Sequence, residues 1–231
     1  MSMHRTKDLS RSVHSMIMRA LFLIPYLLLQ VLALAQVGNS GDTSRWVPYQ
    51  GGMDLNDGIY LDFNAFRYNR PTVPMERLRD DQGMPISDIR KVVSKLYMLK
   101  EDGTREAIRM HQLWGFCQND VVYVQAGNGF YRIGLMGTLA HMMYERSVRE
   151  WDPYLYRGGT MQRTYVVQQM LDMRTGEFLP FNAAGMDHAL RHDPVLQEEF
   201  RALPKKQRNS DEALFRFLRV YNDRHLLEFP M

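Results

Sequence analysis

The sequence predicts an α+β fold, in which an antiparallel β-meander sheet carries C-terminal α-helices packed against it and a signal peptide precedes both. Three observations lead to this class. Short runs of strand-forming residues separated by turn residues fill 111–144, helical spacing appears only after Asn182, and an unbroken apolar run follows a basic N-terminus. Strands first and helices last are typical of α+β domains.

Residues 1–35 are predicted to be a signal peptide. A polar, basic segment up to Arg19 is followed by the apolar run Ala20–Ala35, which ends in Ala33-Leu34-Ala35. A basic start, a short apolar stretch and an A-x-A end are the three parts of a secretory signal. At 1.5 Å per residue the run measures roughly 24 Å, less than the ~30 Å core of a bilayer. We therefore expect export with cleavage after Ala35, and a retained membrane anchor is the alternative.

The remainder of the chain is electrically neutral. The 231 residues are 45% hydrophobic and 24% charged, as in a globular protein, and carry a formal net charge of +3. That excess lies wholly before Gln36, where four basic residues accompany a single acidic one. A neutral domain has no general attraction for nucleic acid or for an anionic membrane. We predict no nucleic-acid binding, and membrane contact only through the signal peptide before cleavage.

Cys117 is the single cysteine, so an intramolecular disulfide is excluded. Its place in a predicted strand favours a small buried side chain. The alternatives are a reactive thiol, an intermolecular bridge, or a nucleophile–base pair with His141 from an adjacent strand. No cofactor is predicted.

The mature chain begins with residues 36–56, whose glycine, serine and aspartate content predicts a flexible N-terminal segment, with Trp46–Tyr49 docking on the body. Residues 57–181 are predicted to form the antiparallel sheet. The first strand, 59–63, alternates apolar and polar side chains, which would place the apolar ones on one face. The elements expected next are a helical turn at 64–69, a surface loop at 72–88, a strand at 92–99, a turn at 101–103 and a returning strand at 104–110.

The stretch His111–Tyr144 is the centre of the predicted sheet. Val121–Val124 is a run of strand formers after the turn-prone Gln118–Asp120. Gly127–Gly129 supplies residues that tolerate a positive φ angle, as a tight hairpin requires. These glycines do not indicate a dinucleotide-binding motif, because that motif needs a helix to follow. The strands predicted after this turn are 130–133 and 138–144.

Residues 145–162 are predicted to leave the sheet, because Trp151, Pro153 and two glycines interrupt the strand pattern. The aromatic residues Trp151, Tyr154 and Tyr156 form a candidate contact surface, and a long loop tucked onto the body is the alternative. The sheet is expected to resume with a strand at 165–173, a turn at 174–177 and a short partner strand at 178–180.

Residues 182–231 are predicted to be the helical part of the same domain. Asn182 can cap a helix over 183–192, and Asp193 followed by Pro194 is typical of the start of the next helix, 195–203. Ser210 is predicted to cap the last helix. The apolar residues that recur there at helical spacing are Leu214, Phe217, Leu218 and Tyr221.

His188 and His192 are four residues apart on a predicted helix, a spacing that can place two imidazoles on one metal ion. The signal is weak, because the H-E-x-x-H pattern is absent and His225 is the single candidate for a third ligand. Solvent-facing histidines on an amphipathic helix are the alternative. The metal prediction therefore rests on two weak candidates.

Familiar catalytic motifs are absent from the sequence. It contains neither the G-x-S-x-G elbow of serine hydrolases nor the G-x-x-x-x-G-K-[ST] phosphate loop. Asp54, Asp57 and Asp62 are carboxylates near the first strand, where turn and capping roles are commoner than catalysis.

Several short motifs resemble those of uncharacterised secreted proteins of Bacteroidota-type bacteria. They are Asp57–Phe66, Asn69–Pro71, Trp114–Cys117, Val122–Val124, Gly129–Tyr131, Thr175–Glu177 and Tyr221–Arg224. The resemblance covers most of the mature chain. It implies export across an inner membrane, and it implies no established activity or catalytic residue.

These observations predict an exported protein, in the periplasm, at the cell surface or outside the cell. It would be a non-enzymatic binding or envelope-associated module with an unidentified envelope or extracellular partner. The alternative is an envelope or extracellular hydrolase that uses carboxylates or a histidine-bound metal.

Overall fold

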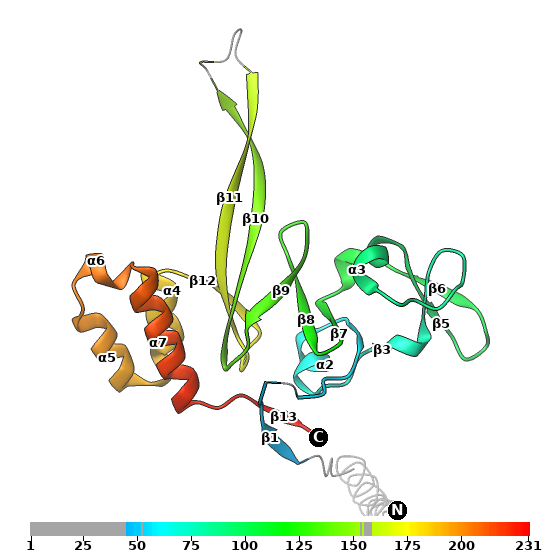
Figure 1. The fold of residues 1–231 in the computed structure, drawn as a ribbon, viewed down its shortest axis with the longest axis horizontal. Helices are drawn as coiled ribbons and strands as arrows, with labels where there is room; N and C mark the ends of the chain where they lie inside the picture. The colour runs from blue at the N-terminus through cyan, green and yellow to red at the C-terminus, as the bar shows by residue number, and fades with distance from the viewer. Residues whose placement is uncertain (1–44, 52, 153, 155–158) are drawn as a thin grey trace, which may run out of the picture. The chain divides into compact units, whose positions relative to one another are not determined.

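The predicted α+β class is confirmed by the computed structural model, which describes residues 45–51, 53–152, 154 and 159–231. Antiparallel strands precede a group of C-terminal helices (Figure 1). The predicted signal peptide, residues 1–35, lies outside the described part of the chain. No helix among the described residues is long and apolar enough to cross a membrane.

The main sheet contains eight strands in the order β12-β11-β10-β9-β8-β7-β2-β3. Each strand pairs antiparallel with its neighbours, and β7 to β12 follow one another in sequence, so the predicted meander is present. The strands are β2 (Gly58–Tyr60), β3 (Val73–Pro74), β7 (Gly115–Gln118), β8 (Val121–Ala126), β9 (Gly129–Leu135), β10 (Leu139–Asp152), β11 (Gly159–Asp172) and β12 (Glu177–Pro180).

Two tight turns shape the meander. Asn119 and Asp120, with φ angles of 50° and 61°, form the two-residue turn between β7 and β8, as expected for a type I′ hairpin. Gly127, with a φ of 55°, is the first residue of the turn between β8 and β9. Gly129 has no positive φ and is already part of β9, so only the first glycine of the predicted turn needs its conformational freedom.

The first predicted strand is shorter than expected. β2 ends at Tyr60, and Asp62 accepts a hydrogen bond from the Ala65 backbone N–H at 2.8 Å, which caps helix α2 (Phe63–Arg67). The apolar–polar alternation therefore stops before Leu61, whose side chain is exposed. A local capping bond outweighs the strand pattern here.

The predicted surface loop at 72–88 is partly ordered into strands. Val73 in β3 and Leu78 in β4 (Leu78–Arg79) are both buried. A second sheet, β4-β5-β6, contains β5 (Leu96–Leu99) and β6 (Arg105–Ile108), and these two form the predicted hairpin.

The strand predicted from residue 92 begins four residues late. The carboxylate of Asp88 accepts a hydrogen bond from the Arg90 N–H, which starts the short helix α3 (Ile89–Val92). A 3₁₀ turn, Val93–Lys95, then leads into β5. Capping by an aspartate again replaces extended backbone with helix.

The segment predicted to be flexible, 36–56, is held in place over its described part. β1 (Trp46–Pro48) pairs antiparallel with β13 (Glu228–Pro230), and the Tyr49 N–H donates to the Leu227 carbonyl at 2.6 Å. Leu55 is buried in the core. The predicted docking of Trp46–Tyr49 on the body is therefore present, through pairing with a segment far away in the sequence.

The C-terminal helices begin at the predicted caps. The side chains of Asn182, Asp193 and Ser210 each accept a hydrogen bond from the backbone N–H group three residues later. The helix expected over 183–192 ends at Ala189 and continues as a 3₁₀ turn, Leu190–His192. The helices are α4 (Ala183–Ala189), α5 (Pro194–Ala202), α6 (Lys205–Arg208) and α7 (Asp211–Arg224).

The helices pack against the ends of β10 and β11. Leu139 and Met170 are buried in one hydrophobic cluster with residues of α4, α5 and α7. The neighbouring residues Ala140 and Leu171 point the other way, into a second cluster with residues of β2, β7 and β8. Alternate residues of a strand face opposite sides, so both faces of this part of the sheet are buried.

Within the stretch predicted to leave the sheet, 145–162, the residues 145–152 and 159–162 instead continue it. β10 and β11 stay paired from Leu139 and Asp172 as far as Asp152 and Gly159 (Figure 1). Pro153 and Gly158, which suggested an interruption of the sheet, lie between the two strands in sequence and outside the described residues. The excursion is therefore a long β-hairpin.

Candidate functional site

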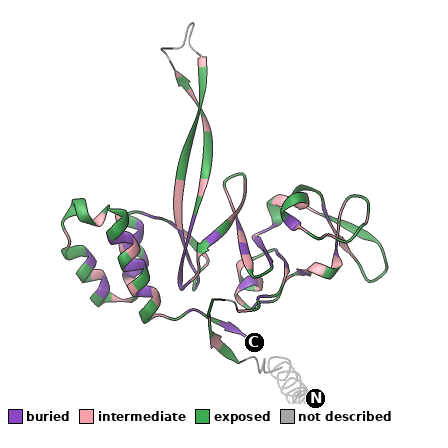
Figure 2. Cartoon of the chain, in the orientation of Figure 1, coloured by how far each residue is buried: buried purple, intermediate pink, exposed green. Residues whose placement is uncertain are grey.

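The outer part of this hairpin, Met143–Asp152 of β10 with Gly159–Gln168 of β11, is called the arm. Figure 2 shows that exposed residues predominate along both of its strands. The exposed large apolar side chains of the arm are Met143, Trp151, Met161, Tyr165 and Val166, which are 36–66% exposed. Exposed apolar side chains close together on a surface can mark a contact with another protein.

Both edges of the arm are open. β9 pairs with β10 only at His141 and Met142, and β12 pairs with β11 only from Gln169 onward. Within the described residues, each strand of the arm therefore has the other strand as its single hydrogen-bonded partner strand. Unpaired backbone groups along such an edge are a template for another strand.

Two contacts show which residues direct their backbone outward. The Phe181 N–H donates to the Gln168 carbonyl at 3.1 Å from the side of β11 that faces away from β10. On the opposite side, the Asn222 amide bonds both the N–H and the carbonyl of Leu139. Outward and inward residues alternate in antiparallel strands, and the register joins Leu139 to Asp172 and Met143 to Gln168. The odd-numbered residues of β10 and the even-numbered residues of β11 therefore face outward.

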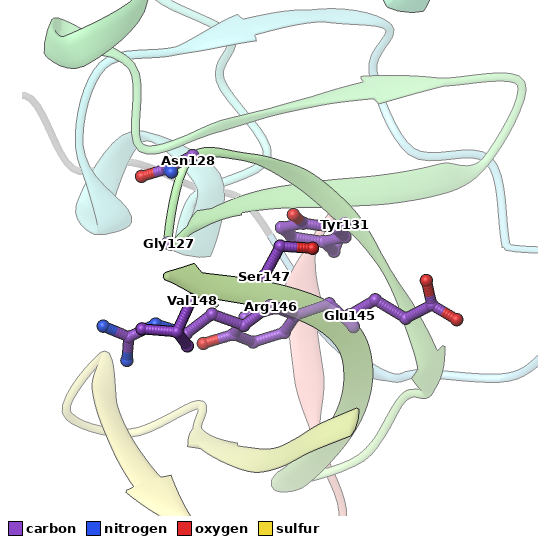
Figure 3. A pocket seen from close by; sticks show the side chains of 8 residues that line it. Gly127, Asn128, Tyr131, Glu145, Arg146, Ser147 and Val148 are labelled. Atoms are coloured by element: carbon purple, nitrogen blue, oxygen red, sulfur yellow. The ribbon is translucent and has the colours of Figure 1, made fainter. Parts of the chain in front are cut away.

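A cleft lies beside the open edge of β10, where β9 diverges from it. The cleft has a volume of about 500 Å³ and is lined by the β8–β9 turn, by Tyr131 and by Tyr144–Val148 (Figure 3). The rings of Tyr131 and Tyr144 stack at 4.6 Å between centroids. This volume is within the range of ligand pockets in proteins.

The charged side chains of the arm differ in their contacts. Glu150 accepts a hydrogen bond from the Tyr165 hydroxyl at 2.8 Å and lies 3.5 Å from Arg163. Glu145 and Arg149 make no ion pair or side-chain hydrogen bond with any described residue. Ion pairs at such surface positions contribute little to stability.

The aromatic residues predicted to form a contact surface are partly placed by the structure. Trp151 is 66% exposed and belongs to β10, and Tyr154 is 96% exposed. Tyr156 lies outside the described residues. The contribution of Met143 and Val166 was not predicted, although the strand-forming run Thr164–Val167 is visible in the sequence.

The two histidines predicted as weak metal ligands are both exposed and are joined by an arginine. Arg191 contacts the Nε2 atoms of His188 and His192, at 3.1 Å for His192. Glu177 lies 3.5 Å from His188, and His225 contacts Asp193 at 3.2 Å. The described residues contain no group of three or more histidine, cysteine, aspartate or glutamate side chains able to hold a metal.

Cys117 is buried in β7, as predicted. Burial, with the carboxylates of Asp57 and Asp120 nearby, raises the pKa of its thiol to about 12. The thiolate needed for nucleophilic attack is therefore scarce at neutral pH. Two strands separate Cys117 from His141, which lies 3.0 Å from Gln168, so the alternative of a nucleophile–base pair is wrong.

The candidate carboxylates near the first strand have separate local surroundings. Asp62 caps α2, and Asp57 accepts a hydrogen bond from the Asn119 N–H at 3.1 Å. The second oxygen of Asp57 is buried and has no hydrogen-bond partner among the described residues, and the charge of this carboxylate contributes to the raised pKa of the Cys117 thiol. Asp54 is exposed.

Comparison of the chain with protein-family models, curated proteins and solved structures finds no match.

Proposed function

We propose that this chain is an exported, non-enzymatic binding module that holds an envelope or extracellular protein partner through the arm. Export is supported by the leader at residues 1–35, with its basic start, apolar run and A-x-A end. Binding is supported by one observation above all. The arm extends ten paired residues beyond both neighbouring strands and leaves its edges open.

Strand addition to the outer edge of β11 is the proposed mode of binding. The outward-facing residues there, Thr160, Gln162, Thr164 and Val166, are uncharged and favour extended backbone. Arg163 is the one charged residue of the edge, and Glu150 lies 3.5 Å from it. The occupant that fits this edge is therefore an extended, uncharged polypeptide segment rich in β-branched or aromatic residues.

The physical gain from such pairing is larger for the arm than for an ordinary edge. A two-stranded hairpin alone is marginally stable in water, and a third strand adds hydrogen bonds and covers apolar side chains. Each added backbone hydrogen bond contributes about 0.5–1.5 kcal/mol net. Burial of apolar surface adds roughly 25 cal/mol per Å², and Val166 and Tyr165 are 60% and 43% exposed.

The proposal is tested by selecting peptides from a random phage-displayed library on the full chain. Selected peptides should be extended and uncharged, and their binding should protect the backbone amides of Gln162, Thr164 and Val166 from hydrogen exchange. Thr164→Pro removes one outward N–H and should abolish binding, because proline cannot donate to a ladder. Thr164→Ala keeps that N–H and should bind like the wild type.

Peptides that bind with protection elsewhere, or that bind the Thr164→Pro variant equally well, would overturn this mode of binding. The alternative, a hydrolase acting through carboxylates or a histidine-bound metal, is not favoured by a specific contact among the described residues.

A further inference from the structure

The open edge of β10 differs in character from that of β11. Its residues include the charged Glu145, Arg146, Arg149, Glu150 and Asp152, whereas the β11 edge has the single Arg163. Charged side chains on an edge ordinarily prevent pairing with other strands. Their effect is reversed if the approaching strand carries the opposite charges at the matching positions.

Backbone geometry restricts how a second copy of β10 can pair with this edge. The odd-numbered residues direct their N–H and carbonyl groups outward, so an odd residue must lie opposite an odd residue of the second copy. This requirement excludes the register that sets Glu145 opposite Glu150 and Arg146 opposite Arg149. Because odd residues pair with odd residues, the midpoint of every allowed antiparallel pairing is a residue. The two-fold axis of the dimer therefore passes through a residue and not between two residues.

Charge then selects among the allowed registers. An axis through Glu145, Arg146, Arg149 or Glu150 places like charges directly opposite each other, which is unfavourable. An axis through Val148 places Trp151 opposite Glu145, so that Glu145 has no opposite charge to pair with. It also places Arg146 opposite Glu150, whose carboxylate already contacts Tyr165 and Arg163 of its own chain.

An axis through Ser147 leaves no such conflict on the outward-facing positions. Glu145 lies opposite Arg149 of the second copy, and both side chains lack a partner within the described part of their own chain. Met143 lies opposite Trp151 of the second copy. These two side chains are 60% and 66% exposed in the isolated chain.

We propose that two copies of this chain pair through β10 in antiparallel register, with the two-fold axis through Ser147. The product is a four-stranded sheet in the order β11-β10-β10-β11. The cleft of about 500 Å³ beside Tyr144–Val148 supplies the space in which the second strand lies (Figure 3). This pairing leaves both β11 edges open and is therefore independent of the binding proposed for that edge.

A cysteine at the axis tests the register directly. Cα atoms of a hydrogen-bonded antiparallel pair are about 5.5 Å apart, within the 4.4–6.8 Å range of disulfides. The full-length Ser147→Cys variant should form a covalent dimer under mild oxidation, and Val148→Cys should not. The wild type controls for Cys117, which is buried. Absence of the Ser147→Cys dimer, or efficient cross-linking of Val148→Cys instead, would overturn the register.

Charge reversal tests the pairing without a covalent bond. Glu145→Arg should weaken dimerisation at least about tenfold in sedimentation equilibrium, because it sets arginine against arginine. Combining it with Arg149→Glu should restore the wild-type dimer, since the two changes exchange the charges of each pair. Circular dichroism checks that each variant is folded. A monomeric wild type, or a double variant no better than the single one, would overturn the proposal.

Discussion

Shortening the arm separates its role in binding from any role in stability. In the proposed variant, residues 147–164 are replaced by Asn-Gly, so that Arg146 and Tyr165, whose backbone groups face each other, flank a two-residue turn. These two residues are cross-strand partners in the structure, and Asn-Gly favours the type I′ turn that joins such a pair. The stacked rings of Tyr131 and Tyr144 remain in place.

The expected change in the free energy of unfolding is small. None of the described residues within 147–164 belongs to the buried hydrophobic clusters or packs against them. Each cross-strand pair that is lost contributes about 0.2–1 kcal/mol. Closing a shorter loop returns about 0.6 kcal/mol for each halving of its length. The shortened variant also avoids the conformational entropy cost of ordering the arm, and a two-stranded hairpin by itself is only marginally stable in water. We therefore expect a net change within about 1 kcal/mol.

Urea unfolding followed by circular dichroism measures this quantity. The midpoint should shift little, and the slope should fall because less surface becomes exposed on unfolding. Phe217→Ala is the control for a true core residue: its ring is buried and lies 5.0 Å from Phe200, and its loss should cost about 3–5 kcal/mol. A loss above about 2 kcal/mol in the shortened variant would refute the view that the arm is dispensable for folding.

Two further predictions concern local structure. Gly127→Ala should lower the free energy of unfolding by about 1 kcal/mol, because Gly127 has a φ of 55°. Gly129→Ala should have little effect, since Gly129 has no positive φ. Thermal unfolding compares the two variants, and equal shifts of the melting temperature would contradict the turn geometry. Burial lowers the pKa of His141 below the unfolded value of about 6.5, and the hydrogen bond with Gln168 only partly opposes this. The unfolded chain then binds the proton more readily, so this contribution to stability is full above about pH 6.5 and is lost as the pH falls towards the folded pKa. The stability difference between the wild type and His141→Gln should therefore shrink from pH 8 to pH 5, and a constant difference would argue against a buried neutral imidazole.

Helix starts were predictable because they depend on neighbouring residues. Asn182, Asp193 and Ser210 each accept a hydrogen bond from an N–H three residues later, and the sequence alone places donor and acceptor together. The same reasoning applies to Asp62, which caps α2, but the apolar alternation of the preceding strand concealed it. Two local patterns competed there, and the structure had to decide between them.

The arm was predicted incorrectly because turn-forming residues were assigned to an excursion from the sheet. Trp151 and Arg149 belong to a strand because residues 159–162 lie opposite them. The candidate site depends on that pairing, since it is what makes the edges, the cleft and the charge pattern of β10. The metal candidates His188 and His192 show the converse. Their spacing suggested one helix face, but His192 lies in the 3₁₀ turn after α4, and Arg191 contacts both imidazoles.

The α+β class, the meander, the helix caps and the burial of Cys117 could be predicted from local patterns in the chain. They follow mainly from the propensities of neighbouring residues. The structure was needed to show that β1 pairs with β13, that β9 leaves β10 after Met142, and that the arm has two open edges. Pairing between strands brings together segments that are far apart in the sequence. The free energy of each pairing depends on the packing of the surrounding side chains and therefore on the rest of the fold.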